Sequence, residues 1–155
     1  MAFSSLFSEE MILHGLHCET AIEAISAITN LMLSLGYVEP AYLNSVIKRE
    51  LRFPTGVPTA PVPVALAHGD PAYVKRNGIA VGILSAPILF REMGAPEHSL
   101  DVEVVFVLAV RQKEKQVHIL KDLMNLISNK QALQDLANAR DAKAASIILR
   151  CNEET

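Results

Sequence analysis

The chain has 155 residues, 50% apolar and 20% charged, with a formal net charge of −3. Its length suits one domain with a well-buried core, and its composition is that of a globular protein. The small negative charge and the lack of any Lys/Arg cluster longer than a pair argue against a nucleic-acid-binding protein.

Helices are predicted at both ends of the chain and strands in its middle. Apolar residues recur at helical spacing near both ends, whereas the middle holds short or nearly continuous apolar runs. This order predicts an α/β fold, a single-domain sandwich with a mixed central β-sheet flanked by helices on both sides. The predicted elements are a short apolar run at 11–16, helices at 19–36 and 40–51, strands at 62–66, 78–84 and 101–110, and helices at 113–128, 129–139 and 141–151.

Local signals predict where two helices begin and which face one of them buries. Thr20 and Glu23 have the capping-box spacing at the start of the first helix. Ser128 and Gln131 have the same spacing before the helix at 129–139. In the helix at 113–128, the predicted apolar face consists of Val117, Leu120, Met124 and Ile127.

Residues 85–99 connect two of the predicted strands and carry strong turn signals. Pro87, Gly94 and Pro96 all lie in this segment. Proline and glycine are typical of turns, because proline cannot donate to a strand ladder and glycine accepts positive φ angles. We therefore expect an irregular connection here.

The two cysteines and the N-terminal sequence bear on the compartment. Cys18 and Cys151 lie near opposite ends of the chain, without the spacing of a disulfide framework or a zinc site. The N-terminus lacks the pattern of a signal peptide, and no run of 18 apolar residues occurs. We expect a soluble, cytoplasmic protein that does not insert into a membrane.

Motifs for metal, nucleotide and hydrolase chemistry are weak or missing. His14, His17 and Cys18 lie close together, but their spacing fits no common metal site, so a metal-binding domain is the least favoured hypothesis. Neither a phosphate-binding glycine loop nor a nucleophile-elbow motif occurs. We expect no metal and no organic cofactor.

His68 stands out among the five histidines because of its context. It follows a short apolar strand and precedes Gly69, so its ring is expected to project from a strand end into a loop. Near neutral pH most imidazole is uncharged, and its free lone pair makes it a nucleophile. The alternative is a proline-stiffened edge strand with an idle, exposed histidine.

Several segments in fixed order carry a resemblance to a known family. "KREL", "FPTGV", "VALAHGD", "GIAVGIL", "VVFVLAV" and "VHILKDLM" follow one another over roughly residues 8 to 150. This pattern resembles the enzyme IIA domain of the phosphoenolpyruvate-dependent sugar phosphotransferase system, of the fructose/mannitol type, and is most similar to galactitol-type proteins. We therefore expect one enzyme IIA-like domain over residues 1–155.

The resemblance implies a phosphotransferase. Such proteins accept a phosphoryl group from the carrier protein HPr on a histidine and pass it to a cysteine of a sugar-specific enzyme IIB. Association with a membrane transporter complex would then be transient. The alternative is a regulatory domain of the same fold, which senses phosphorylation and acts by docking to a partner.

The resemblance also implies the site residues. The family's V-A-I-P-H-G motif maps onto "VALAHG" and so onto His68, with Ala67 in place of the family proline. Arg49 matches the arginine of the family's R-E pair at the end of the second helix. Its planar fork of donors suits phosphate oxygens. His118 matches a second histidine, which would donate a ring N–H to the phosphoryl group or orient His68, and Asp122, one turn later, would fix its tautomer. Support for the phosphoryl group and its loop is expected from Thr55, Gly56 and Gly69.

Overall fold

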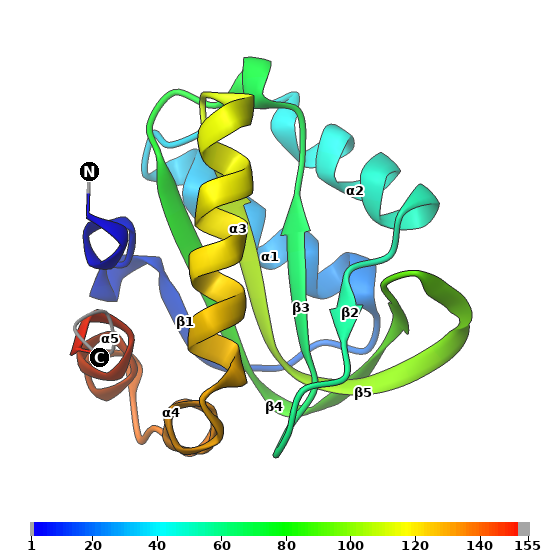
Figure 1. The fold of residues 1–155 in the computed structure, drawn as a ribbon. Helices are drawn as coiled ribbons and strands as arrows, with labels where there is room; N and C mark the ends of the chain where they lie inside the picture. The colour runs from blue at the N-terminus through cyan, green and yellow to red at the C-terminus, as the bar shows by residue number, and fades with distance from the viewer. Residues whose placement is uncertain (1, 152–155) are drawn as a thin grey trace.

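The computed structural model describes residues 2–151 of the chain. A mixed five-stranded β-sheet lies at its centre, with α-helices on both faces (Figure 1). This confirms the predicted α/β class. The strands are β1 (Ile12–Leu16), β2 (Gly56–Val57), β3 (Val64–His68), β4 (Gly78–Glu92) and β5 (Ala95–Ala109), and the helices are α1 (Ala21–Ser34), α2 (Tyr42–Arg52), α3 (Lys113–Ser128), α4 (Lys130–Ala137) and α5 (Ala142–Cys151).

The strands pair in both orientations. β4 lies parallel to β1 and antiparallel to β5. β5 lies parallel to β3, and β3 is antiparallel to the short β2. The end of the β4–β5 hairpin curves back to β2, where Gly56 pairs with Glu92 (Figure 1).

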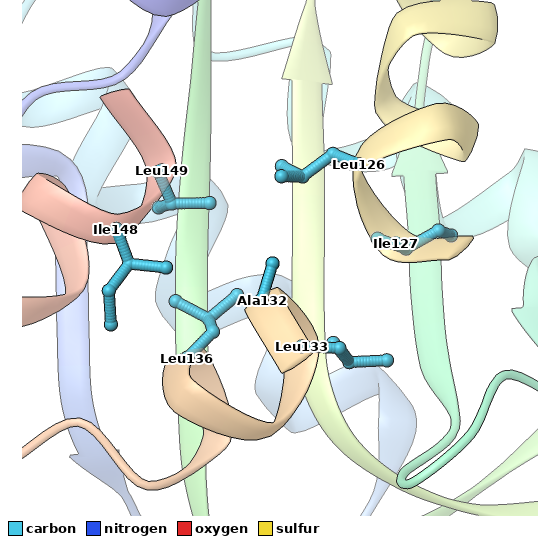
Figure 2. A pocket seen from close by; sticks show the side chains of 7 residues that line it. All are labelled: Leu126, Ile127, Ala132, Leu133, Leu136, Ile148 and Leu149. Atoms are coloured by element: carbon cyan, nitrogen blue, oxygen red, sulfur yellow. The ribbon is translucent and has the colours of Figure 1, made fainter. Parts of the chain in front are cut away.

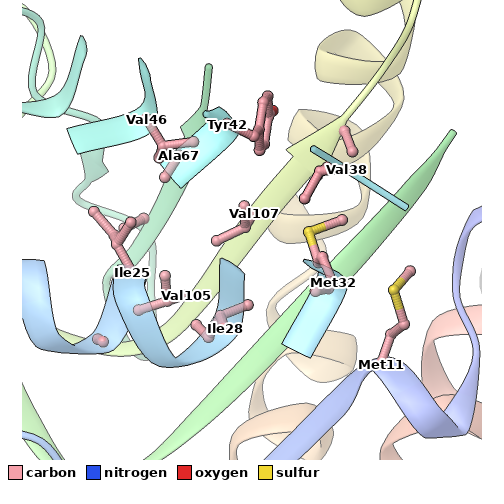
Figure 3. Packing of buried hydrophobic residues seen from close by; sticks show 14 of the residues in the cluster. Met11, Ile25, Ile28, Met32, Val38, Tyr42, Val46, Ala67, Val105 and Val107 are labelled. Atoms are coloured by element: carbon pink, nitrogen blue, oxygen red, sulfur yellow. The ribbon is translucent and has the colours of Figure 1, made fainter. Parts of the chain in front are cut away.

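Alternation along β3 decides which layer each side chain joins. Ala65 and Ala67 pack in the core beneath α1 and α2, which Figure 3 shows for Ala67 beside Val46. Val64 and Leu66 pack in the other core, beneath α3, α4 and α5. Since successive side chains of a strand point to opposite faces, His68 belongs to the α3 side of the sheet.

The turn prediction over residues 85–99 is wrong for both prolines. Pro87 lies within β4 and Pro96 within β5, each next to an irregularity in the pairing of the two strands. A proline is tolerated where the ladder is already interrupted, because no hydrogen bond from its nitrogen is lost there. The prediction holds for Gly94, which has a φ of 77° in the hairpin turn.

Helix capping follows the prediction at one of the two sites. Thr20 caps α1, since its hydroxyl group accepts a hydrogen bond from the backbone nitrogen of Glu23 at 3.2 Å. The prediction for Ser128 is wrong, because this residue is the last of α3. Asn129 caps α4 instead, accepting from the backbone nitrogen of Ala132 at 3.0 Å.

The buried face of α3 also differs from the prediction. Of the four predicted residues, Ile127 is buried and Leu120 packs partly buried against the core, whereas Val117 and Met124 are 66% and 41% exposed. Leu123, which was not predicted, is also buried. Leu123 and Met124 differ by about 100° around the helix, so the buried face is turned toward Leu123 and away from the exposed side with Val117 and Met124. Leu123 and Ile127 therefore define the face that meets the sheet, and Gln116 continues it toward the start of the helix.

The helices do not extend to lengths suited to a bilayer. Among residues 2–151, no helix is both long and apolar enough to cross a membrane.

An apolar cavity of about 10 Å³ lies between α3, α4 and α5 (Figure 2). It is too small and too apolar to hold a ligand or a stable water molecule, so it marks a packing gap in the core.

Candidate active site at the end of β3

His68 is the last residue of β3 and only 8% exposed. The predicted position at a strand end is correct, but the ring is more buried than expected, because His68 still pairs with Leu108 of β5. Its Nδ1 lies 3.4 Å from the carbonyl oxygen of Leu66. A carbonyl oxygen can only accept, so this hydrogen bond requires the proton on Nδ1 and leaves the lone pair on Nε2.

The surroundings of His68 favour its neutral form. Burial and then the positive charge of Arg49 lower the pKa of His68 from 6.5 to about 4, against a smaller opposite effect of the hydrogen bond to Leu66. The ring is therefore uncharged near neutral pH. A neutral imidazole beside a guanidinium group is suited to attack an anionic electrophile.

Two side chains of α2 hold the backbone that follows His68. The Tyr42 hydroxyl group accepts a hydrogen bond from the nitrogen of Gly69 at 3.0 Å and donates to the carbonyl oxygen of Leu108. The Ser45 hydroxyl group accepts from the nitrogen of Asp70 at 2.9 Å. These contacts fix the exit of the chain from β3 and thereby the position of the imidazole.

Gly69 is required by the close approach of this backbone to α2. A Cβ atom at Gly69 would overlap Ser45 Oγ and lie 2.9 Å from Val46 Cγ2.

Tyr42 and Ser45 were not predicted from the sequence. Their spacing of three residues, continued by Arg49 four residues later, places all three on one face of α2 and is the signal that identifies them.

An open cavity of about 510 Å³ lies at this end of the sheet, between α2 and α3. Figure 1 shows the end of β3 and the starts of α2 and α3 at the same end of the molecule. Two cations and one carboxylate line the cavity, and the positive end of the α3 dipole adds to the cations. An anionic group therefore suits this place. The lining residues are Ser45, Arg49, Gly69, Asp70, Pro71, Lys113 and Gln116.

His118 does not line this cavity. It is exposed on α3, and at 3.6 residues per turn it lies about 200° around the helix from Gln116. Asp122, its predicted partner, is also exposed. Arg49 therefore lines the cavity and lowers the pKa of His68, whereas His118 does not line it and its role stays a prediction.

Thr55 and Gly56 lie in the segment between α2 and β3. Both the nitrogen and the hydroxyl group of Thr55 donate to the carboxylate of Glu50, at 3.0 and 2.7 Å. Glu50 is 7% exposed, and burial raises its pKa. A Cβ atom at Gly56 would lie 2.6 Å from the carbonyl oxygen of Arg91. These contacts stabilise the loop between α2 and β3. Both donors of Thr55 are bonded to Glu50 and so are not free to bind a phosphoryl group.

Three residues were considered for a metal site, namely His14, His17 and Cys18. His14 Nε2 lies 2.6 Å from the carbonyl oxygen of Ala139, and His17 Nδ1 lies 3.4 Å from the hydroxyl group of Ser85. Cys18 is a free thiol. Within the described residues, no group of three or more His, Cys, Asp and Glu side chains is arranged to hold a metal ion.

Comparison with known proteins gives a consistent result. The family model described as "Phosphoenolpyruvate-dependent sugar phosphotransferase system, EIIA 2" matches residues 5–151. The galactitol-specific EIIA component of Escherichia coli (strain K12) is 24% identical over 114 residues, which make up 74% of this chain and 75% of that protein.

Solved structures share the fold at low sequence identity. The complex of enzyme IIAMTL with phosphorylated enzyme IIBMTL from Escherichia coli matches with a TM-score of 0.78 and 21% identity, covering 92% of this chain and 96% of the matched chain. The nitrogen regulatory protein IIA-Ntr from Neisseria meningitidis matches with a TM-score of 0.75 and 22% identity, covering 94% and 97%.

Proposed function

Because the chain belongs to the EIIA 2 family of the phosphoenolpyruvate-dependent sugar phosphotransferase system, we propose that it carries a phosphoryl group on His68. One observation supports this proposal above the others. The imidazole of His68 is buried and neutral, because burial and the charge of Arg49 lower its pKa. The next residue, Gly69, lines a cavity suited to an anion. A neutral histidine nucleophile near a guanidinium group suits transient phosphorylation, because the guanidinium can balance the charge of the transferred group.

In the first transfer, HPr is the proposed donor. The lone pair of His68 Nε2 attacks the phosphorus atom of phosphohistidine, the donor's P–N bond breaks, and the donor imidazole leaves. The proton stays on Nδ1, where the carbonyl oxygen of Leu66 accepts its hydrogen bond and stabilises the charge that the ring gains. Arg49 balances the charge spread over the phosphoryl oxygens in the loose transition state.

In the second transfer, the phosphoryl group passes to the cysteine of an enzyme IIB. The thiolate attacks phosphorus, the bond to His68 Nε2 breaks, and the imidazole returns to its neutral form. We propose a galactitol-like enzyme IIB as the acceptor, since a galactitol-specific EIIA component is among the relatives. The chain would meet both HPr and the enzyme IIB in the cytoplasm.

A regulatory role is the second candidate. The fold is shared with a nitrogen regulatory protein at a TM-score of 0.75. A regulatory domain would accept phosphate on the same histidine but would act by docking to a partner. Onward transfer to an enzyme IIB cysteine separates the two functions.

The test is phosphorylation of the purified chain with phosphoenolpyruvate, enzyme I and HPr. Wild type should gain an acid-labile, base-stable label, and the label should pass to a galactitol-type enzyme IIB. A His68→Ala variant should gain none. Full labelling of His68→Ala would refute the proposed site, and stable labelling without onward transfer would favour the regulatory role.

A further inference from the structure

Gln116 has a polar atom without a partner at the edge of the cavity. Its side-chain nitrogen Nε2 is buried and makes no hydrogen bond with any other group in residues 2–151. A buried amide donor left unpaired is costly, so such groups nearly always have a partner in the working state of a protein. The side chain lines the cavity together with Arg49 and Lys113, and that cavity is where a partner would bind.

The position of Gln116 in the fold points to an anionic partner. Gln116 and Lys113 lie in the first turn of α3, where the unpaired backbone N–H groups give the helix a positive end. Arg49 reaches the same cavity from α2. His68 lies on the α3 side of the sheet, by the alternation of β3. Donors from α2 and α3 therefore line one cavity, and Gly69 and Asp70, the two residues directly after His68, line it as well.

We propose that the Gln116 amide donates a hydrogen bond to an oxygen of the phosphoryl group on His68, with Lys113 and Arg49 as the flanking cations. This inference rests on the proposed function. It assigns to Gln116 the donor role that the sequence pattern suggested for His118. No covalent bond forms or breaks at Gln116, whose donor stabilises the phosphoryl oxygens most strongly in the transition state.

The chemistry of an amide gives this site a distinctive property. Glutamine does not titrate, so its donor is present at every pH, whereas a histidine in its place would donate differently on either side of its pKa. The charged groups that line the cavity are Arg49 from α2, Lys113 from α3 and Asp70 after β3, and His68 directly precedes the lining residue Gly69. His68 is uncharged between pH 6 and 8 before phosphorylation, because its pKa is lowered to about 4.

The experiment compares rates of label uptake from phosphorylated HPr. Gln116→Ala should react at least about tenfold more slowly than wild type, since loss of one donor to a developing anion has effects of this size or larger. Gln116→Glu, of nearly the same shape, should react more slowly still because it repels the phosphoryl group. Gln131→Ala on α4 is the matched control and should react at the wild-type rate. Circular dichroism checks the fold of each variant.

A pH series adds a readout that a purely structural role would not change. The wild-type rate should vary little between pH 6 and 8, apart from the pH dependence of phosphorylated HPr itself. Dividing each variant's rate by the wild-type rate at the same pH removes that dependence. For Gln116→His that ratio should change with pH as the new imidazole titrates. For Gln116→Ala the ratio should stay constant.

The outcomes separate this inference from the proposed function. If wild type takes up no label, the proposed function fails and this inference fails with it. If wild type is labelled on His68 and Gln116→Ala keeps the rate of Gln131→Ala, the inference alone is wrong. It is also wrong if His118→Ala slows uptake more than Gln116→Ala does. The inference is supported if Gln116→Ala is folded, takes up label more slowly than wild type, and keeps a constant ratio to the wild-type rate between pH 6 and 8.

Discussion

The hydroxyl group of Tyr42 accepts a hydrogen bond from the backbone nitrogen of Gly69 at 3.0 Å. The same hydroxyl group donates to the carbonyl oxygen of Leu108, the residue that pairs with His68 in the sheet. One buried side chain of α2 thus connects both strands that position His68. Burial raises the pKa of this hydroxyl group, which keeps it protonated and able to donate.

Tyr42→Phe should therefore weaken both the fold and the transfer. The change leaves the nitrogen of Gly69 and the carbonyl oxygen of Leu108 without their side-chain partner in a buried place, which costs about 1–3 kcal/mol. Urea denaturation measures this loss, and label uptake from HPr should slow because the exit from β3 is less firmly held. Tyr73→Phe is the control; if both variants lose equal stability, the role assigned to the Tyr42 hydroxyl group is wrong.

Arg49→Lys tests whether the shape of the guanidinium group matters beyond its charge. Lysine keeps the charge but loses the planar fork of donors, so label uptake should slow about tenfold or more while the fold remains. Arg52→Lys is a close control, because Arg49 and Arg52 both lie over the Phe53 ring, at 5.5 and 5.4 Å from its centroid, but of the two Arg49 alone lines the cavity. Equal rates for the two variants would remove Arg49 from the site.

Glu50→Ala should destabilise the loop between α2 and β3. The variant leaves two buried donors of Thr55 unpaired, and we expect the free energy of unfolding to fall by about 1–3 kcal/mol. Glu97→Ala, at an exposed position, should change it by less than about 0.5 kcal/mol. A Glu50→Ala protein as stable as Glu97→Ala would show that the Glu50–Thr55 contact contributes little.

The lowered pKa of His68 predicts a pH dependence of stability. Between about pH 4 and 6.5 the unfolded chain binds a proton at this residue that the folded chain does not, so the free energy of unfolding rises with pH. The contribution is lost as pH falls through this range and amounts to about 3 kcal/mol at most.

Comparison with His68→Ala isolates this contribution, because other titrating groups cancel in the difference. The free energy of unfolding of wild type minus that of the variant should increase from pH 4 to pH 6.5 and then level off. Urea denaturation at several pH values gives this difference. A difference that stays constant, or that decreases with rising pH, would contradict the buried, neutral state of His68.

Much of the fold could be predicted from periodicity, and the failures have local causes. The helices at 113–128 and 141–151 lie within one residue of their predicted ends, because long amphipathic patterns are strong signals. The β4–β5 hairpin was missed since Pro87 and Pro96 suggest turns, and a sequence does not reveal that a ladder is irregular at those points. The pairing of β2 with β4 is a long-range contact without a local signal.

The site could be predicted only in part. His68 and Arg49 followed from the family pattern, and the structure places Arg49 close enough to lower the pKa of His68. Gln116, the donor proposed above, was not predicted, because the apolar face of α3 was drawn partly through the exposed Val117 and Met124. Adding Leu123 to the predicted Ile127, and leaving out Val117 and Met124, turns the face so that Gln116 lies toward the sheet and His118 away from it.

The most direct test of the central claim is to locate the phosphoryl group on the protein. The chain is incubated with phosphoenolpyruvate, enzyme I and HPr, weighed intact by mass spectrometry, and then digested under alkaline conditions for peptide sequencing. We predict one phosphoryl group per chain, on His68, with His14, His17, His98 and His118 unmodified. A phosphoryl group on any other residue, or none at all, would contradict this claim.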